Sequence, residues 1–280
     1  MIKLSIITIN FNNLDGLQIT IESVVNQTWQ EFEYIVIDGG STDGSAEYIK
    51  TQNENIDYWV SETDKGIYNA MNKGIAKATG EYLLFLNSGD HLYSHVVLEE
   101  NNKYIENYDL IYFNLQMVGG GFSEIINYPE QLRFYDLYFG SLPHPATFIR
   151  KEMFKTIGMY DENLKIVSDW KFFILALFRD NCTYQKVNYT FSTFYLDGIS
   201  SREVFTEERA LVLKEYFSGY ILDYIEMNNN KIKLKKYMEI MESRRYKVFF
   251  DIEKSLIGRK LLAVFFRIWI LLNSRKTMKY

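Results

Sequence analysis

Hydrophobic positions in the first hundred residues follow two alternating periods. Apolar, β-branched runs predict four strands, at residues 3–9, 33–38, 58–60 and 81–86. Apolar positions at helical spacing predict three helices between them, at residues 16–27, 43–50 and 67–78. Ser41 or Thr42 is available to cap the second helix, and Gly80 to stop the third. This order predicts an α/β fold built on a doubly wound, mostly parallel, Rossmann-like sheet.

The pattern changes twice further along the chain. Residues 110–116 and 187–194 predict strands, and residues 169–177 predict a helix with an apolar face. From residue 206 onward the spacing is helical, over 206–224, 231–253 and 261–272. We therefore expect a catalytic domain over 1–204, with halves at 1–92 and 93–204, and a C-terminal helical extension over 205–280.

Charge is distributed unevenly over the 280 residues. Residues 231–280 hold 14 Lys and Arg against 4 Asp and Glu, whereas the whole chain has a net charge of -5. A basic extension on an acidic body indicates contact with an anionic partner. The single cysteine, Cys182, excludes an internal disulfide and a Cys-rich zinc site. No signal-peptide pattern opens the chain, which predicts a cytoplasmic location.

Polar residues follow each of the four predicted strands. In doubly wound sheets the ligand lies at the carboxyl ends of the strands, so the segments 8–12, 38–41, 64–66 and 87–90 are expected to line one crevice. Asp38 could accept hydrogen bonds from a nucleobase or a ribose, and a carboxylate such as Asp90 suits Mg²⁺ or Mn²⁺ beside phosphate oxygens. The structural alternative makes these acids helix caps, but it does not explain why Lys, Gly, Tyr and Asn crowd together after Asp64.

Four motifs in order give the chain a resemblance to family 2 glycosyltransferases, the inverting group with the GT-A fold. The motifs are Ser5-Ile6-Ile7-Thr8-Ile9-Asn10-Phe11-Asn12, Val36-Ile37-Asp38-Gly39-Gly40-Ser41-Thr42-Asp43-Gly44, Asp64-Lys65-Gly66-Ile67-Tyr68-Asn69-Ala70-Met71-Asn72-Lys73-Gly74 and Leu86-Asn87-Ser88-Gly89-Asp90. The resemblance covers residues 3–92, with weaker matches to about residue 200.

The resemblance implies a role for several donor-side residues. It assigns Thr8, Asn10 and Asp38 to the nucleoside, usually uridine, and Asp64 and Lys65 to the base or diphosphate. Asn72 and Ser88 complete the expected donor-binding set. Asp90 matches the last acid of the family's Asp-x-Asp metal motif and implies a divalent cation, Mn²⁺ or Mg²⁺. This sequence departs from that motif, because Asn87-Ser88-Gly89 stand where other members carry more acids.

The catalytic base is expected in the second half. Ile166-Val167-Ser168-Asp169-Trp170 resembles the family's acidic element at the start of a helix, so Asp169 matches the general base. An inverting transfer needs one carboxylate to take the proton of the acceptor hydroxyl as its oxygen attacks the anomeric carbon. His144, Trp170 and Ser200 are expected near the acceptor or diphosphate. The structural alternatives are that Asp169 is an ordinary helix N-cap and that His144 has no role beyond packing.

The basic, apolar extension suggests where the acceptor resides. The run 261–272 is too short to cross a bilayer, which takes about 20 residues, but it fits an interfacial helix on anionic lipid. The sequence thus predicts hexose transfer from a UDP-sugar to a lipid-linked saccharide at the inner face of the membrane, in surface polysaccharide (O-antigen-type) synthesis. The alternatives are helices that pack or form a homodimer, a nucleotidyltransferase, or a catalytically weak sugar-nucleotide-binding protein. Nucleic-acid binding is not expected.

Overall fold

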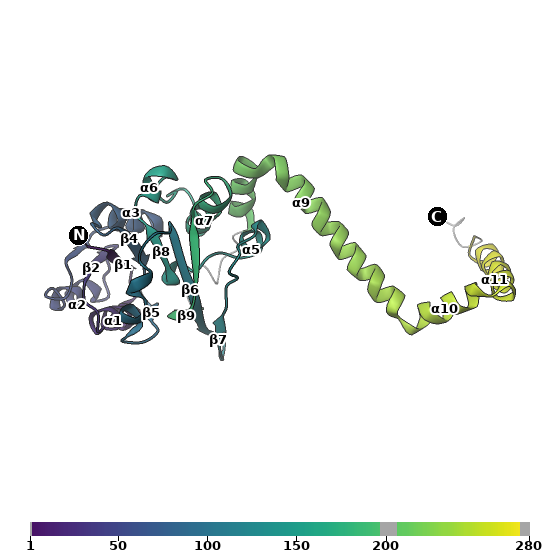
Figure 1. Cartoon of the computed structure of the whole chain (residues 1–280), viewed down its shortest axis with the longest axis horizontal. Helices are drawn as coiled ribbons and strands as arrows, with labels where there is room; N and C mark the ends of the chain where they lie inside the picture. Colours follow the sequence, from purple (N-terminus) through teal and green to yellow (C-terminus); the bar gives the residue numbers. More distant parts are fainter. Residues whose placement is uncertain (1, 197–205, 275–280) are drawn as a thin grey trace. The chain divides into compact units, whose positions relative to one another are not determined.

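The computed structural model describes residues 2–196 and 206–274. The chain divides into two compact units, Met1–Val212 and Leu213–Tyr280. The predicted site residues that the structure describes all belong to the first unit, which contains the sheet (Figure 1).

Four parallel strands form the first half of the sheet. They are β1 (Leu4–Asn10), β2 (Phe32–Asp38), β3 (Tyr58–Ser61) and β4 (Tyr82–Phe85), in the spatial order β3-β2-β1-β4. The connecting helices are α1 (Leu14–Val25), α2 (Ser45–Thr51) and α3 (Ile67–Lys77). Asn10 at the end of β1 is in register with Asp38 at the end of β2. The predicted α/β, doubly wound fold is confirmed, because each crossover carries a helix between parallel strands.

The second half of the sheet mixes strand directions. Its strands are β5 (His91–Leu92), β6 (Leu110–Gly119), β7 (Phe122–Ile126), β8 (Thr147–Arg150) and β9 (Tyr184–Tyr195). β8 pairs antiparallel with both β4 and β6, β9 runs parallel to β6, and β5 and β7 pair antiparallel with β9 and β6. The shorter elements are α4 (Val97–Asn101), η1 (Asn102–Tyr104), α5 (Phe134–Phe139), η2 (His144–Ala146), α6 (Met153–Thr156) and α7 (Ser168–Phe178).

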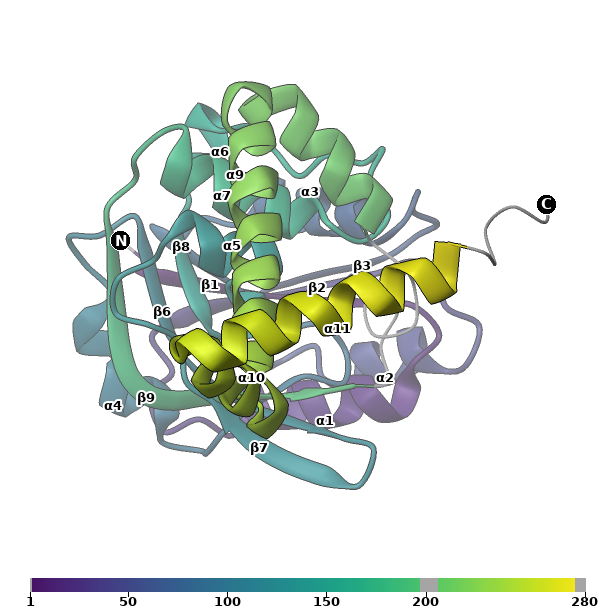
Figure 2. The same cartoon turned by 90° about the vertical axis from the view of Figure 1, so that its right-hand side faces the viewer.

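Helices cover both faces of this sheet (Figures 1 and 2). On one face, α1 and α2 bury Leu17 and Ile49 in one apolar cluster with Ile6 of β1. On the other face, α3 approaches β1 so closely that a Cβ at Gly74 would lie 2.5 Å from Ile7 Cγ2. The α6 and α7 aromatic rings extend that second layer. Continuous apolar strands such as β1 are therefore buried on both sides, as parallel strands require.

Two local predictions were wrong. Helix α2 is not capped by Ser41 or Thr42: its N-cap is Gly44, whose φ of 96° suits glycine, while the Asp43 side chain accepts the backbone N–H of Ser45 at 3.1 Å. Helix α3 ends at Lys77, before Gly80. Gly80 instead permits close contact with β1, since a Cβ there would lie 2.6 Å from the Ser5 backbone nitrogen.

The C-terminal helices are α9 (Thr206–Glu242), α10 (Arg244–Lys254) and α11 (Leu256–Ser274). Helix α9 is interrupted at Phe217, whose φ of -130° is not helical. A sharp corner joins α10 to α11, and Gly258 is required there because a Cβ would lie 1.9 Å from the Ile252 carbonyl oxygen. Among the described residues, no helix has the length and apolar character needed to cross a membrane.

Candidate active site

The end of β2 is organised around the carboxylate of Asp38. This side chain is fully buried and accepts hydrogen bonds from Asn10 Nδ2 at 2.7 Å, Ser61 Oγ at 2.6 Å and Ser41 Oγ at 2.5 Å. Asn10 and the Ser41 hydroxyl bind Oδ1, while Ser61 and the backbone N–H groups of Gly40 and Ser41 donate to Oδ2. Burial acts to raise the pKa of Asp38, but these hydrogen bonds outweigh it and hold the pKa below its ordinary value. Asp38 thereby shapes the loop at the mouth of the crevice.

Two predicted nucleoside contacts lie deeper than expected. Thr8 is fully buried within β1, where its hydroxyl lies 3.0 Å from the Tyr34 hydroxyl. Asn10 is almost fully buried and also donates to Ser41 Oγ at 3.2 Å. In the described structure the Thr8 hydroxyl and the Asn10 Nδ2 group are hydrogen-bonded to neighbouring side chains. They therefore hold the strand ends and the Asp38 carboxylate in place.

Asp64 and Ser88 lie in the loops that follow the carboxyl ends of β3 and β4. Asp64 Oδ1 accepts the Gly66 N–H at 2.8 Å, and its Oδ2 occupies the space that a Cβ at Gly39 would need. Lys65 is exposed on this loop. The Ser88 carbonyl accepts Asn13 Nδ2 at 3.0 Å. The predicted rim residues therefore come from the ends of β3 and β4, as a ligand site of a doubly wound sheet requires.

Asn72 holds the two halves of the first unit together. Its Nδ2 donates to the Tyr160 carbonyl at 2.8 Å and to Glu162 Oε1 at 3.0 Å, and its Oδ1 accepts the Tyr160 N–H at 3.0 Å. Asn69 on the same helix donates to Glu162 Oε2 at 2.9 Å. These contacts use both ends of the Asn72 amide in the described structure, and its donor-binding role stays a prediction.

His144 lies between the buried carboxylate of Asp90 and the partly exposed carboxylate of Asp169. Its Nδ1 is 3.4 Å from Asp169 Oδ2, and its Nε2 is 3.8 Å from Asp90 Oδ2. Burial acts to lower the pKa of His144, but the hydrogen bond with Asp169 and the charges of Asp169 and Asp90 raise it above its ordinary value. The Asn87 amide lies 3.2 Å from Nε2. The atom at that distance is Asn87 Nδ2, a donor, so a protonated Nε2 requires the amide to turn over and present its Oδ1, which has no hydrogen-bond partner among the described residues.

Asp169 occupies the first turn of α7, as predicted. Besides His144, its partner is the Tyr68 hydroxyl, which lies 2.9 Å from Oδ1. Burial would raise the pKa of Asp169, but the hydrogen bond and charge of His144 and the hydrogen bond from Tyr68 lower it below its ordinary value. The side chain keeps 18% of its surface exposed. Asp169 is therefore an ionised, oriented and accessible carboxylate.

The remaining two predicted contacts have different outcomes. Trp170 is 1% exposed, donates its indole N–H to the Leu137 carbonyl at 2.6 Å and carries the Arg209 guanidinium 4.7 Å above its ring. It lies on the buried side of α7, with almost none of its surface exposed, and its contact with the acceptor or diphosphate stays a prediction. Ser200 lies outside the described residues.

Sequence reasoning missed Tyr68, Asn87 and Glu162. For Tyr68 the available signal was the crowding of polar residues after Asp64, in which Lys65 and Asn72 had been given donor roles and Tyr68 none. Tyr68 and Asn72 reach residues 101 and 88 positions away along the chain. No local period reveals such contacts, so only the folded chain identifies them.

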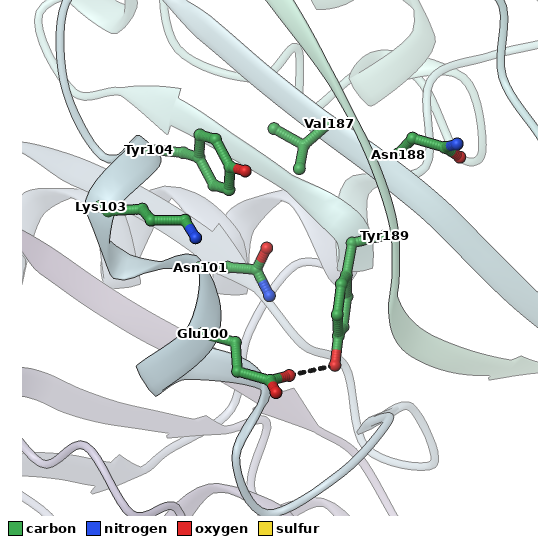
Figure 3. Close-up of a pocket in the computed structure, with 7 residues that line it drawn as sticks. All are labelled: Glu100, Asn101, Lys103, Tyr104, Val187, Asn188 and Tyr189. Atoms are coloured by element: carbon green, nitrogen blue, oxygen red, sulfur yellow. Dashed lines mark hydrogen bonds between the residues drawn. The ribbon is translucent and has the colours of Figure 1, made fainter.

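A separate pocket of about 420 Å³ opens between α4, η1 and β9 (Figure 3). Its lining residues are Glu100, Asn101, Lys103, Tyr104, Val187, Asn188 and Tyr189. The Tyr189 hydroxyl donates to the Glu100 carboxylate across its mouth. None of the predicted site residues contributes to this pocket.

A doubly wound sheet with polar strand ends and an oriented carboxylate beside them fits the GT-A fold of glycosyltransferases that the sequence motifs indicate. The sequence model of Glycosyl transferase family 2 matches residues 5–162, which is more than half of the chain. The chain belongs to this family and is a glycosyltransferase.

Relatives and solved structures agree with this placement. An uncharacterized glycosyltransferase of Mycobacterium tuberculosis is 35% identical over 180 residues, covering 61% of this chain and 68% of that protein. A PGL/p-HBAD biosynthesis glycosyltransferase of Mycobacterium bovis is 33% identical, with 60% and 67% covered. S. aureus TarS in complex with UDP-GlcNAc is similar in fold, with a TM-score of 0.62, 20% identity and 76% and 64% covered.

A more distant solved structure extends the comparison. The mannosyltransferase PcManGT of Pyrobaculum calidifontis, in complex with GDP-Man and Mn²⁺, is similar over 92% of this chain and 86% of its own. Its TM-score is 0.55 at 12% identity, so the likeness concerns the fold. Family membership favours sugar transfer over the nucleotidyltransferase alternative.

Proposed function

We propose that this protein is an inverting hexosyltransferase that uses a UDP-sugar and glycosylates a lipid-linked saccharide in surface polysaccharide synthesis. The observation that carries the proposal is the environment of Asp169, a partly exposed carboxylate that His144 and Tyr68 hold ionised. A carboxylate in this state accepts a proton from a hydroxyl that is becoming a nucleophile.

The transfer needs one bond to form and one to break. The acceptor hydroxyl oxygen attacks the anomeric carbon while Asp169 takes its proton. The bond between the anomeric carbon and the diphosphate oxygen breaks, and its electron pair leaves with the diphosphate. Attack from the face opposite the leaving group inverts the anomeric configuration. A single base is sufficient, because the diphosphate leaves without gaining a proton from the protein.

Asp90 is the residue that would hold a divalent cation. Asp90 is 6% exposed and lies in the loop between β4 and β5. No group of three or more His, Cys, Asp or Glu side chains in the described part of the chain is arranged to hold a metal. A single carboxylate suits Mg²⁺ or Mn²⁺ whose other ligands are diphosphate oxygens and water. The bound cation would supply charge neutralisation for the departing diphosphate. His144 would add a positive charge on the same side.

The proposal of a UDP-sugar donor is supported by a solved structure of similar fold and by the polar loops at the strand ends. TarS, which shares the fold, binds UDP-GlcNAc, whereas PcManGT binds GDP-Man. The test is transfer or hydrolysis with a panel of UDP-hexoses, UDP-GlcNAc and GDP-mannose in the presence of Mn²⁺. We expect turnover of one UDP-sugar with inversion, read by NMR at the anomeric centre. Turnover of GDP-mannose alone would contradict the donor assignment, and binding of no nucleotide would contradict the crevice itself.

The lipid-linked acceptor is supported by helix α11. This helix carries three cations, Arg259, Lys260 and Arg267, and no carboxylate. Lys260 and Arg267 are seven residues apart and so lie on one side of the helix. Large apolar side chains are exposed around the rest of its surface: Ile257, Leu261, Phe265, Ile268, Trp269 and Leu272. Such a helix fits the interface of an anionic membrane. A relative named for PGL/p-HBAD biosynthesis is consistent with an acceptor of this kind.

Membrane binding is expected to depend on these charges. Each Lys or Arg near an anionic surface contributes about 1 kcal/mol. Reversing two of them, in Lys260→Glu/Arg267→Glu, should weaken binding to phosphatidylglycerol vesicles by more than about tenfold. Vesicle co-sedimentation measures this.

The control is Lys50→Glu/Lys155→Glu, which makes the same change in net charge at exposed positions of the first unit. Equal losses in both variants, or equal binding to neutral phosphatidylcholine vesicles, would contradict the assignment to α11.

A further inference from the structure

The Tyr68 hydroxyl lies between two acceptors at the start of α7. It is 2.9 Å from Asp169 Oδ1 and 2.5 Å from the Ile166 carbonyl oxygen. Tyr68 itself sits in the first turn of α3 and is 5% exposed. Its ring packs against the ring of Tyr160, with centroids 5.7 Å apart. The packed ring therefore fixes the position of the hydroxyl oxygen, while the O–H bond can still turn about the C–O bond.

A phenolic hydroxyl has one proton to donate and lone pairs to accept. While Asp169 is ionised, the Tyr68 proton is best directed at Oδ1. Once Asp169 has taken a proton, its need for the Tyr68 donor is reduced, and the Tyr68 proton can turn to the Ile166 carbonyl oxygen 2.5 Å away. The Tyr68 hydroxyl thus has an acceptor for its proton in both protonation states of Asp169.

We infer that Tyr68 is a positioning residue for the catalytic base, with a hydroxyl that rotates between Asp169 and Ile166 as the base gains and loses its proton. This inference rests on the proposed function, in which Asp169 is that base. No proton is transferred by Tyr68 itself: the proton from the acceptor hydroxyl stays on Asp169 until it passes to solvent.

The opposite side of the carboxylate is held as well. His144 Nδ1 lies 3.4 Å from Asp169 Oδ2, while Tyr68 holds Oδ1. Because His144 and Tyr68 engage different oxygens, the carboxylate plane cannot rotate freely. A carboxylate has about four lone-pair sites, so one remains for the acceptor hydroxyl. Fixed orientation of this kind is what general-base catalysis requires.

Helix α3 connects this arrangement to the donor side. Tyr68 follows four residues after Asp64, on the rim of the crevice. Asn69 and Asn72 on the same helix fix Tyr160 and Glu162, which precede α7. The polar residues crowded after Asp64 thus hold the base in a defined position relative to the donor rim. A purely structural helix face would not need a tyrosine directed at the accessible carboxylate.

Several titratable or charged groups face Asp169. They are Tyr68 from α3, His144 from η2, Tyr160 from the segment before α7, and Arg209 from α9. Burial, with the nearby carboxylate of Asp169, raises the pKa of Tyr68 far above its ordinary value, so its hydroxyl keeps its proton across the working pH range.

The test compares Tyr68→Phe with Tyr82→Phe. Both variants lose the hydroxyl of a buried ring, and the Tyr82 hydroxyl donates to the Tyr108 carbonyl at 2.6 Å, at the start of β4 and so at the opposite end of that strand from the loop 87–90. We expect Tyr68→Phe to lower kcat by up to about 10²-fold with the donor KM unchanged. We expect Tyr82→Phe to retain the wild-type kcat.

The pH profile gives a second readout that a merely structural role would not move. A base works only when ionised, so kcat falls as the pH drops through the pKa of Asp169. Loss of the Tyr68 donor raises that pKa, and the acidic limb of the kcat profile should move to higher pH in Tyr68→Phe. Thermal unfolding of both variants, followed by circular dichroism, verifies that each is folded at the assay temperature.

The outcomes separate this inference from the proposed function. Wild-type kcat and an unmoved acidic limb in Tyr68→Phe would overturn the inference, as would an equal loss of kcat in Tyr82→Phe. If instead Asp169→Asn retains transfer, the proposed base is wrong and the function must be revised, whatever Tyr68→Phe shows.

Discussion

Asp169→Asn is expected to lower kcat by about 10²- to 10⁴-fold, the range that general-base catalysis contributes. The amide has nearly the shape of the carboxylate but cannot accept a proton at neutral pH. Nucleotide binding should persist, because the strand-end loops around Asp38 and Asp64 do not depend on this side chain. Steady-state transfer assays, together with calorimetric titration of UDP, measure the two effects separately.

Asp180, just beyond the other end of α7, offers a matched control. Asp180 follows the C-terminal end of α7 and pairs with Arg179 at 2.6 Å, away from Tyr68 and His144. Asp180→Asn should therefore leave kcat unchanged. Transfer by Asp169→Asn at more than about a tenth of the wild-type rate would contradict its role as the base, since the expected loss is at least about 10²-fold.

Asp90→Ala is expected to have the second large effect, a loss of transfer of about 10³-fold. Stabilising the departing diphosphate with a divalent cation is worth several kcal/mol, and each 1.36 kcal/mol is a factor of ten in rate. Wild-type enzyme treated with EDTA should lose transfer to a similar degree and recover when Mn²⁺ is added.

Asp90→Ala treated in the same way should be insensitive to Mn²⁺. This comparison distinguishes loss of a metal ligand from general damage, because a damaged but metal-competent enzyme would still respond to the cation. Full transfer by the wild type in EDTA would contradict the metal assignment and would leave His144 as the cation beside the diphosphate.

The sequence determined the first half of the fold nearly completely. Strands such as β1 are buried on both faces and so must be continuously apolar, and the helices between them must be apolar on one side. Those patterns are local, so they can be read from neighbouring residues. The position of Asp169 at the start of a helix could be predicted for the same reason.

The tertiary structure decided what local patterns do not carry. The strand order β4-β8-β6-β9, with its mixed directions, depends on pairings between segments far apart in the chain. Gly80 could be taken for a helix stop until its close contact with Ser5 was seen. Asp38 turned out to be saturated by hydrogen bonds from within the protein.

The candidate site shows the same division. Its acids could be named from the sequence, because a carboxylate after a buried strand or at a helix start is a local feature. Their arrangement could not: His144 lies between Asp90 and Asp169, and Tyr68 meets a carboxylate 101 residues away. Side-chain contacts of this range are set by how the two halves of the sheet pack, and only the folded chain fixes that packing.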